Sequence, residues 1–202
     1  MKIAGLLVLK VWPDESREPV ILCKSSDVSQ SGYFRRPSTK ELQSINFFGR
    51  TFAGRTPPGQ RQSVQEQEYT VHSYNRNGLC ALGFMDDDYP VRSAFSVLNQ
   101  VLDEYEKEFG DSRKSAQTDS NQPWPYLSEA LSKFQDPIMA DKVLRIQRET
   151  DETKIILYKT IDSVLSRNEK LESLIEKSLD LSKASKSFYK QAKKTNQCCT
   201  IL

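Results

Sequence analysis

The sequence contains no long hydrophobic run, and neither glycine nor proline occurs after Pro137. The apolar stretch Ile3 to Leu9 ends at Lys10 and is far shorter than the about 18 apolar residues of a membrane-spanning helix. No small-residue cleavage site follows it, so we interpret the stretch as a buried strand and not as a signal peptide. Because nothing breaks a helix after Pro137, the second half of the chain can be helical.

The sequence also has little net charge and few cysteines and histidines. Its 29 basic and 27 acidic residues leave a net charge of +2, whereas nucleic-acid binding favours a strongly basic face. Four cysteines, two of them adjacent near the carboxyl end, do not match a secreted disulfide framework and favour a reducing cytosol. The single histidine, His72, lies in a strand-like run, where a structural or solvent-facing role is expected.

These residues do not predict catalytic chemistry. A Ser/Cys–His–acid arrangement cannot be assembled from the sequence, and the G-x-x-x-x-G-K-[ST] loop of a GTPase is absent from it. We therefore expect a protein that is not an enzyme and that has no catalytic residue, cofactor, metal site or small-molecule substrate.

The first 110 residues predict an α+β domain in which helices flank an antiparallel sheet. Two apolar runs, Ile3 to Val11 and Val20 to Leu22, predict one strand pair, and Asn77-Gly78 between two further runs predicts a hairpin. A helix follows each pair, the first with capping-box spacing of Ser38 and Glu41. A short third helix follows a polar stretch. The inner stripes of the three helices contain Leu42, Ile45, Phe48 and Phe52, then Val91, Phe95, Leu98, Val101, Leu102 and Tyr105, then Leu127, Ala130, Leu131 and Phe134.

After Pro137 the sequence repeats every seven residues. Apolar and small residues alternate at three- and four-residue spacing, which predicts the seam of a coiled coil about 80 Å long as one helix. The seam consists of Val143, Ile146, Thr150, Thr153, Leu157, Thr160, Val164, Arg167, Leu171, Leu174, Ser178, Leu181, Ser185, Phe188, Ala192 and Thr195.

The seam does not by itself identify the helices with which it pairs. A homodimer is the simple alternative, but six seam positions are Ser or Thr and bury little apolar area. Two copies of Arg167 would also face each other in a dry layer. The arginine suits partner helices that present amide or carboxylate acceptors, or it extends out of a loosely packed layer.

The segment DETKIILYKTIDSVLSRNEKLESLIEKSLDLSKASKSFYKQAKK resembles the SNARE motif of the synaptobrevin-like R-SNAREs. The β-β-α-β-β-α order before it resembles their profilin-like longin domain. Together with the terminal CCTIL, the whole chain resembles the lipid-anchored members of this family that lack a transmembrane helix. The resemblance implies a longin domain over 1–134, an R-SNARE motif over 138–197 and a lipidation signal over 198–202.

The resemblance implies a mechanism as well. Arg167 would meet glutamines from three partner SNARE helices in a parallel four-helix bundle, and zippering from Val143 toward Thr195 would draw two membranes together. The implied location is the cytosol and the cytosolic face of Golgi, endosomal and vesicle membranes. A lipid-anchored longin adaptor or tether that regulates trafficking without fusing membranes is the alternative.

The final four residues, Cys199 to Leu202, fit the C-a-a-X prenylation signal, with Cys199 as the modified residue. Cys198 is the expected site of a second lipid, since one chain gives only reversible membrane binding. An accidental match or a metal-binding pair is the alternative. A terminal leucine favours geranylgeranyl transfer, unlike the family habit, so the identity of the first lipid stays open.

The first predicted helix carries more apolar residues than one stripe needs. Ile45 and Phe47 lie on another part of its circumference than Phe48 and Phe52. They either serve the domain core or cover a partner segment. We expect the SNARE segment, broken into shorter helices, to fold back over this surface and help shelter the lipid.

Overall fold

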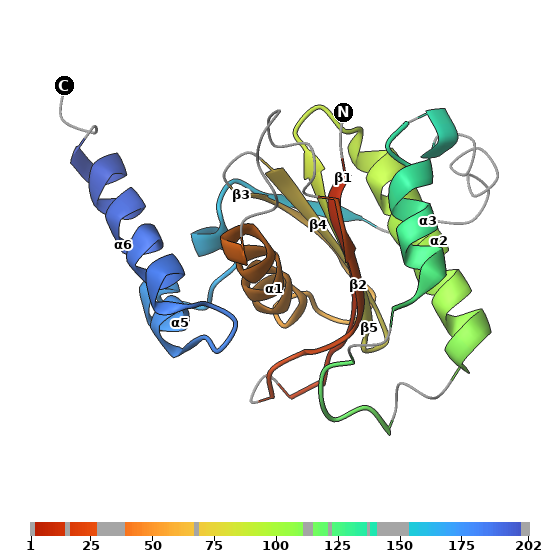
Figure 1. Cartoon of the computed structure of the whole chain (residues 1–202), viewed down its shortest axis with the longest axis horizontal. Helices are drawn as coiled ribbons and strands as arrows, with labels where there is room; N and C mark the ends of the chain where they lie inside the picture. Colours follow the sequence, from red (N-terminus) through yellow and green to blue (C-terminus); the bar gives the residue numbers. More distant parts are fainter. Residues whose placement is uncertain are drawn as a thin grey trace.

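The computed structural model describes residues 3–14, 17–27, 39–66, 69–110, 115–120, 123–136, 138–140 and 154–198, without the side chains of 39–41 and 192–198. It has one six-stranded sheet with helices on both faces (Figure 1). The strands, in the order in which they lie in the sheet, are β2 (Val20–Ser26), β1 (Ile3–Lys10), β5 (Leu79–Asp86), β4 (Tyr69–Arg76), β3 (Arg61–Glu66) and β6 (Ile155–Tyr158). The helices are α1 (Thr39–Ala53), α2 (Val91–Phe109), α3 (Pro125–Lys133), α5 (Leu171–Lys177) and α6 (Lys183–Cys198), with a 3₁₀ turn, η2 (Ile161–Ser163), before α5.

β1 lies inside the sheet, between β2 and β5, and is buried on both faces because helices cover both sides of the sheet. Successive side chains of a strand point to opposite faces, so this one strand supplies both cores. Ile3, Leu6 and Val8 belong to the core under α2 and α3, whereas Leu7 and Leu9 belong to the core under α1. A register shift between Ile3 and Gly5 accounts for the offset of Ile3.

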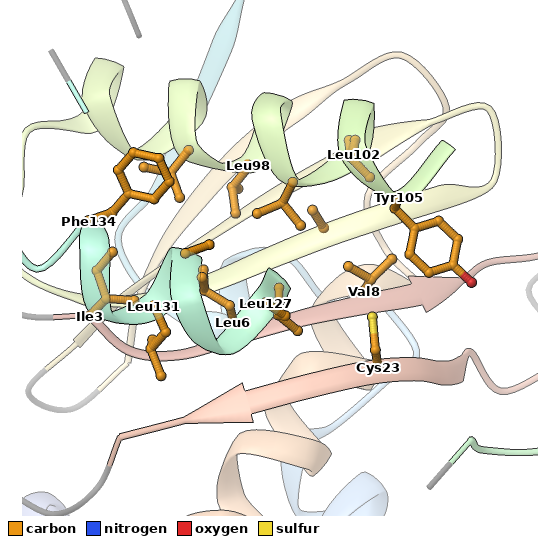
Figure 2. Close-up of a cluster of buried hydrophobic side chains, with 14 of the residues drawn as sticks. Ile3, Leu6, Val8, Cys23, Leu98, Leu102, Tyr105, Leu127, Leu131 and Phe134 are labelled. Carbon is orange, nitrogen blue, oxygen red and sulfur yellow. The ribbon is translucent and has the colours of Figure 1, made fainter. Parts of the chain in front are cut away.

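The helices form two layers (Figure 1). α2 packs on β5 and β4, and α3 packs on β2 and β1, so the two helices cover one face. Figure 2 shows apolar side chains of both helices in this core. The predicted inner stripe of the third helix is confirmed, since Leu127, Ala130 and Leu131 are buried. α1 covers the other face. In the predicted stripe of α1, Ile45, Phe48 and Phe52 are buried, but Leu42 is 36% exposed.

The predicted hairpin turn is present between β4 and β5. Asn77 and Gly78 have φ angles of 51° and 85°, the left-handed values that a two-residue hairpin turn requires. A Cβ at Gly78 would lie 2.9 Å from the carbonyl oxygen of Val11, so glycine is needed there for space as well as for conformation.

The structure corrects three expectations for the sheet. It has a strand, β3, that the predicted order omits, because its buried positions include Gln62 and Ser63 and lack an apolar alternation. β6 lies parallel to β3, so the sheet is mixed and not antiparallel. β6 also occupies residues that the heptad pattern assigns to a helix. Ser38 and Val143 lie outside the described residues, as does the side chain of Glu41.

His72 has a structural position. Its side chain is fully buried, its Nδ1 lies 2.8 Å from the hydroxyl of Ser63, and its ring meets that of Phe95 edge to face. Burial lowers the pKa of His72 to about 4, so the ring is neutral near pH 7.

Candidate functional site

The carboxyl-terminal segment, residues 154–191, lies over the face of the domain that carries α1 (Figure 1). It begins as β6, which pairs with the edge of β3 from Arg61–Ile155 to Val64–Tyr158. It continues through η2, α5 and α6. From residue 154 onward the heptad-patterned segment is therefore broken into separate elements, and the first of these described elements is a strand and not a helix. We call this arrangement the closed form.

An apolar cluster joins the segment to α1. Ile161, Ile175 and Leu181 are 4–5% exposed and belong to the same buried cluster as Ile45 and Phe47. The rings of Phe48 and Tyr189 meet edge to face with centroids 5.6 Å apart. Val164, Leu171 and Leu174 are partly buried against this cluster. Ile45 and Phe47 thus belong to one buried cluster that contains both core residues of the domain and residues of the segment.

Hydrogen bonds fix the start of α6 on α1. Gln43 Oε1 accepts from the backbone N–H of Ser182 at 3.1 Å and from the hydroxyl of Ser185 at 2.9 Å. The hydroxyl of Tyr189 donates to Ser44 Oγ at 2.6 Å. These neutral bonds replace bonds to water, so each contributes about 1 kcal/mol.

Two arginines of the α1 region bind carboxylates of the segment. Arg55 donates through Nε and Nη2 to Glu169 at 3.1 and 2.7 Å. The hydrogen bond from Arg55 lowers the pKa of Glu169 below its ordinary value. Arg50 donates through Nε to Asp180 at 2.8 Å. Burial lowers the pKa of Arg50, but hydrogen bonds and charges of Asp119 and Asp180 outweigh burial and raise the pKa above its ordinary value.

α5 leaves a cavity of about 510 Å³ against the domain. Its apolar wall includes Trp12, Phe47 and Leu174, and its charged wall includes Arg50 and Arg55. The cavity is lined by both parts of the chain. Any ligand that fills it therefore contacts the closed form more extensively than an open one.

The predicted seam residues occupy different environments. Leu181 and Ser185 are buried, Val164, Leu171 and Leu174 are partly buried, and Leu157 and Phe188 are 67% and 53% exposed. Arg167 is exposed in a turn between η2 and α5. Val143, Ile146 and Cys199 lie outside the described residues, as do the side chains of Ala192 and Cys198.

Sequence reasoning missed a second stripe of contact residues. Ile161, Ile175 and Tyr189 recur two heptads apart, and each follows a seam residue by one position. Apolar residues outside the seam were the available signal, because a two-helix seam has no use for them. The closed form thus uses residues of its own besides those that it shares with the seam.

Among the residues that the structure describes, none of the helices combines the length and the hydrophobicity that a bilayer crossing needs. A sheet flanked by helices, with a heptad-patterned segment folded over one layer, is the arrangement expected of a SNARE protein with a longin domain. Two family models match the chain, the regulated-SNARE-like longin domain over residues 30–138 and synaptobrevin over residues 142–200.

Curated relatives match over the full length of both chains. The chain is 72% identical to the VAMP-like protein YKT61 and 65% identical to the VAMP-like protein YKT62, both of Arabidopsis thaliana, over 202 residues. It is 47% identical over 205 residues to the synaptobrevin homolog YKT6 of Eremothecium gossypii. The chain therefore belongs to the longin-domain synaptobrevin family, the R-SNAREs. Its role is in vesicular transport and membrane fusion, and it is not an enzyme.

Proposed function

We propose that this R-SNARE alternates between the closed form and an open helix that assembles with three glutamine-bearing SNARE helices. In the open form Arg167 occupies the central layer and donates to the glutamine side chains. Support comes from the family, from the seam and from the position of Arg167, which the closed form leaves exposed at a turn.

The observation that carries this proposal is the double use of the segment. Residues 155–158 donate and accept backbone hydrogen bonds as a strand on β3, and the same backbone groups are used within the helix of a bundle. Leu181 is buried against α1, whereas zippering would bury it against partner helices. The two states exclude each other, so the longin domain inhibits assembly through Ile45, Phe47 and their neighbours.

Zippering supplies the free energy for fusion by burying the seam. Full burial of a large apolar side chain contributes about 1.5–3 kcal/mol, and Leu157 and Phe188 are still largely exposed in the closed form. Opening the segment loses the burial of Ile161 and Ile175, and bundle formation more than offsets this loss through the seam residues. The domain boundaries that follow are 1–134 for the longin domain, 138–197 for the SNARE motif and 198–202 for the lipidation signal.

Two lipids anchor the open form. Cys199 carries a prenyl group and Cys198 a second lipid, since two chains give an anchor that can transmit force. Lys190 and the lysines that follow it add attraction to an anionic leaflet. The closed form shelters the lipid, and the cavity with its apolar wall of Trp12, Phe47 and Leu174 supports this step. The protein then cycles between cytosol and Golgi, endosomal and vesicle membranes, in steps that include transport from ER to Golgi.

Hydrogen exchange on the full-length chain tests the closed form. We expect the amides of α5, α6 and β6 to be protected in the wild type and to exchange faster after Phe47→Ser or Ile45→Ser, while membrane partition increases. Exchange of residues 154–191 at the rate of an unstructured peptide, with unchanged membrane partition, would show that no closed form exists.

Reconstituted fusion tests the open form. Arg167→Leu is expected to leave the closed form intact and to disturb assembly with glutamine-bearing partners, which a pull-down followed by partner identification would name. Binding to SNARE partners without lipid mixing would support an adaptor instead. Unchanged assembly and fusion with Arg167→Leu would exclude the central-layer role.

Fractionation tests the anchor. We expect Cys199→Ser to be wholly cytosolic and Cys198→Ser to bind membranes weakly and reversibly. Mass spectrometry of the terminus would identify each lipid. A Cys199→Ser protein that stays firmly on membranes would contradict the proposed modification.

A further inference from the structure

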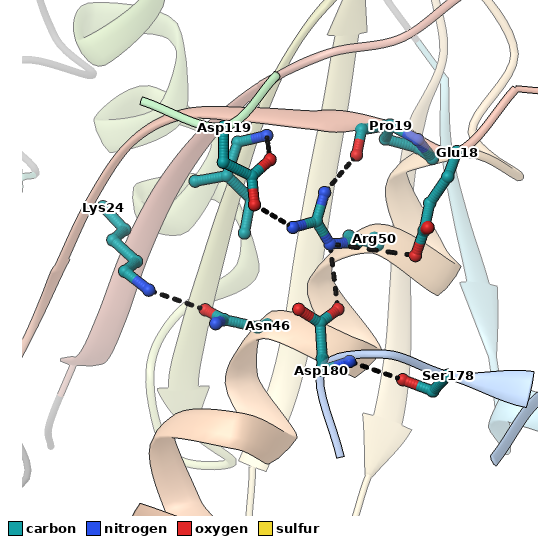
Figure 3. A network of polar contacts seen from close by, with 9 residues as sticks. Glu18, Pro19, Lys24, Asn46, Arg50, Asp119, Ser178 and Asp180 are labelled. Carbon is teal, nitrogen blue, oxygen red and sulfur yellow. Dashed lines mark hydrogen bonds and ion pairs between the residues drawn. The ribbon is translucent and has the colours of Figure 1, made fainter. Parts of the chain in front are cut away.

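Arg50 of α1 lies where three parts of the chain meet, as Figure 3 shows. Its guanidinium donates to the carboxylate of Asp119, to the backbone carbonyl of Pro19 and, through Nε at 2.8 Å, to Asp180 Oδ2. Glu18 lies 3.8 Å from the same Nε. The Arg50 side chain is only 11% exposed. These acceptors come from the approach to β2, from the segment 115–120 and from the stretch between α5 and α6.

Asp119 is itself fixed to the outer strand of the sheet. Its Oδ1 accepts from the backbone N–H of Ile21 at 3.0 Å, and the N–H of Ser120 donates to the carbonyl of Ile21 at 2.9 Å. Burial raises the pKa of Asp119, but the hydrogen bonds from Arg50 and Ile21 lower it more, so the carboxyl is ionised near pH 7. Within the part of the chain that the structure describes, the hydrogen bonds of the Asp119 carboxylate thus join it to α1 and β2 and not to the carboxyl-terminal segment.

A guanidinium is a rigid planar fork. When Asp119 and Pro19 hold its two terminal nitrogens, the direction of the Nε–H bond is determined as well. That bond points at Asp180, whose side chain is 13% exposed. Asp180 lies between α5 and α6, where its own backbone N–H donates to Ser178 Oγ at 3.1 Å. Two contacts that do not involve the segment therefore orient the fork toward Asp180.

We propose that Asp119 is a positioning residue for the closed form, which couples the β2 edge of the sheet to docking of the carboxyl-terminal segment through Arg50. The inference rests on the proposed inhibitory contact and adds a regulatory residue outside that contact. Coupling is reciprocal. A partner that binds the β2 edge and draws Asp119 away would loosen Asp180, and release of the segment would loosen residues 119–120 from β2.

Hydrogen exchange on the full-length protein provides the test, with wild type, Asp119→Asn, Asp180→Asn and the double variant. We expect Asp119→Asn to accelerate exchange of the α5 and α6 amides about two- to fivefold, the range for a partly exposed ion pair. The double variant should exchange like Asp180→Asn alone, because both changes act through one arginine. Arg50→Lys keeps the charge but not the fork, so it should resemble Asp119→Asn.

Asp103→Asn is the matched control. Asp103 binds Arg76 on the α2 side, and its side chain is 51% exposed against 42% for Asp119. It should leave α5 and α6 unchanged. Protection of the β1 and β5 amides from exchange shows that a variant is folded. If Asp119→Asn does not fold, Arg50→Lys tests the coupling in its place.

The outcomes separate this inference from the proposed function. Free exchange of α5 and α6 in the wild type would overturn both the closed form and the coupling. Wild-type protection with an Asp119→Asn effect confined to residues 115–120 and β2 would overturn the coupling alone. Additive effects of Asp119→Asn and Asp180→Asn would do the same.

Discussion

The two faces of the sheet are covered in different ways. On one face, α2 and α3 bury large apolar side chains completely, among them Leu98, Leu102 and Phe134. On the other, α1 is covered in turn by the carboxyl-terminal segment, where Leu171 and Leu174 are only partly buried and hydroxyl and amide groups make many of the bonds. Water can replace such polar bonds at little cost. We therefore expect the packing of α2 and α3 to be permanent and the packing of the carboxyl-terminal segment on α1 to be reversible.

The largest effect should follow a cavity in the permanent core. Leu98 is fully buried, so Leu98→Ala is expected to lower the free energy of unfolding by about 3 kcal/mol, through lost burial and an unfilled cavity. Chemical denaturation of the full-length chain measures this. If Leu98→Ala lowered the free energy of unfolding no more than Ile175→Ala in the carboxyl-terminal segment, the proposed difference between the two faces would be wrong.

Acid should weaken the same core through His72. The folded pKa is lowered to about 4 from an ordinary value near 6.5, so the unfolded chain binds this proton first. The contribution is fully present above about pH 6.5 and is lost as the pH falls toward 4, by about 3 kcal/mol in all. Denaturation from pH 7 to 4 measures it, and His72→Gln, which does not titrate, should give a flatter profile. Parallel profiles would contradict the assignment.

A single substitution outside the seam should be enough to release the carboxyl-terminal segment from α1. Ile175 is 5% exposed in the contact but follows the seam residue Leu174. Ile175→Ala is expected to accelerate exchange of the α5 and α6 amides at least about tenfold. Burial of an isoleucine side chain contributes about 1.5–3 kcal/mol, and about 1.4 kcal/mol corresponds to tenfold in the equilibrium. Assembly with partners should become faster.

Leu174→Ala is the matched control for Ile175→Ala. Leu174 belongs both to the contact and to the seam, so its loss should open the segment and also weaken the assembled bundle. If both variants weakened the bundle equally, the stripe of Ile161, Ile175 and Tyr189 would not be specific to the closed form.

The smallest effect should come from the ion pair of Arg55 with Glu169. The Glu169 side chain is 34% exposed, so Glu169→Gln is expected to cost the closed form only about 0.5 kcal/mol. Because the hydrogen bond from Arg55 lowers the pKa of Glu169, this contribution is present above the ordinary glutamate pKa and is lost as the pH falls through the lowered value. Exchange of the α5 amides measures it. Asp162→Asn, an exposed acid of the same segment, should have no effect, and an equal effect would refute the pairing.

The elements that the sequence predicted well are those whose pattern has one interpretation. The continuous apolar run of β1, the turn at Asn77-Gly78 and the stripe of α2 each satisfy local geometry and burial together. β3 escaped prediction because polar groups hold it in place. The hydroxyl of Ser63 on β3 lies 2.8 Å from Nδ1 of His72 on β4, and Oε1 of Gln62 on β3 accepts from the hydroxyl of Thr56 at 3.5 Å. Such bonds leave no hydrophobic periodicity to detect.

The contact surface on α1 could be predicted only in part. The surplus of apolar residues around Ile45 and Phe47 indicated that something covers the helix. Arg50 could not be singled out, because Pro19, Asp119 and Asp180 are far from it and from one another in the chain. Sequence spacing carries no information about such a meeting point.

The sequence by itself predicted the heptad seam, the arginine at its centre and the lipidation of the cysteine pair, because heptad spacing and a four-residue motif are local patterns. Only the tertiary structure decided that Ile155–Tyr158 form a strand. Those four residues are β-branched, aliphatic or aromatic and suit a strand as well as a helical seam. β3 provides backbone partners for this strand on the edge that does not pair with β4. In the proposed cycle, the partner that the segment binds decides between strand and helix.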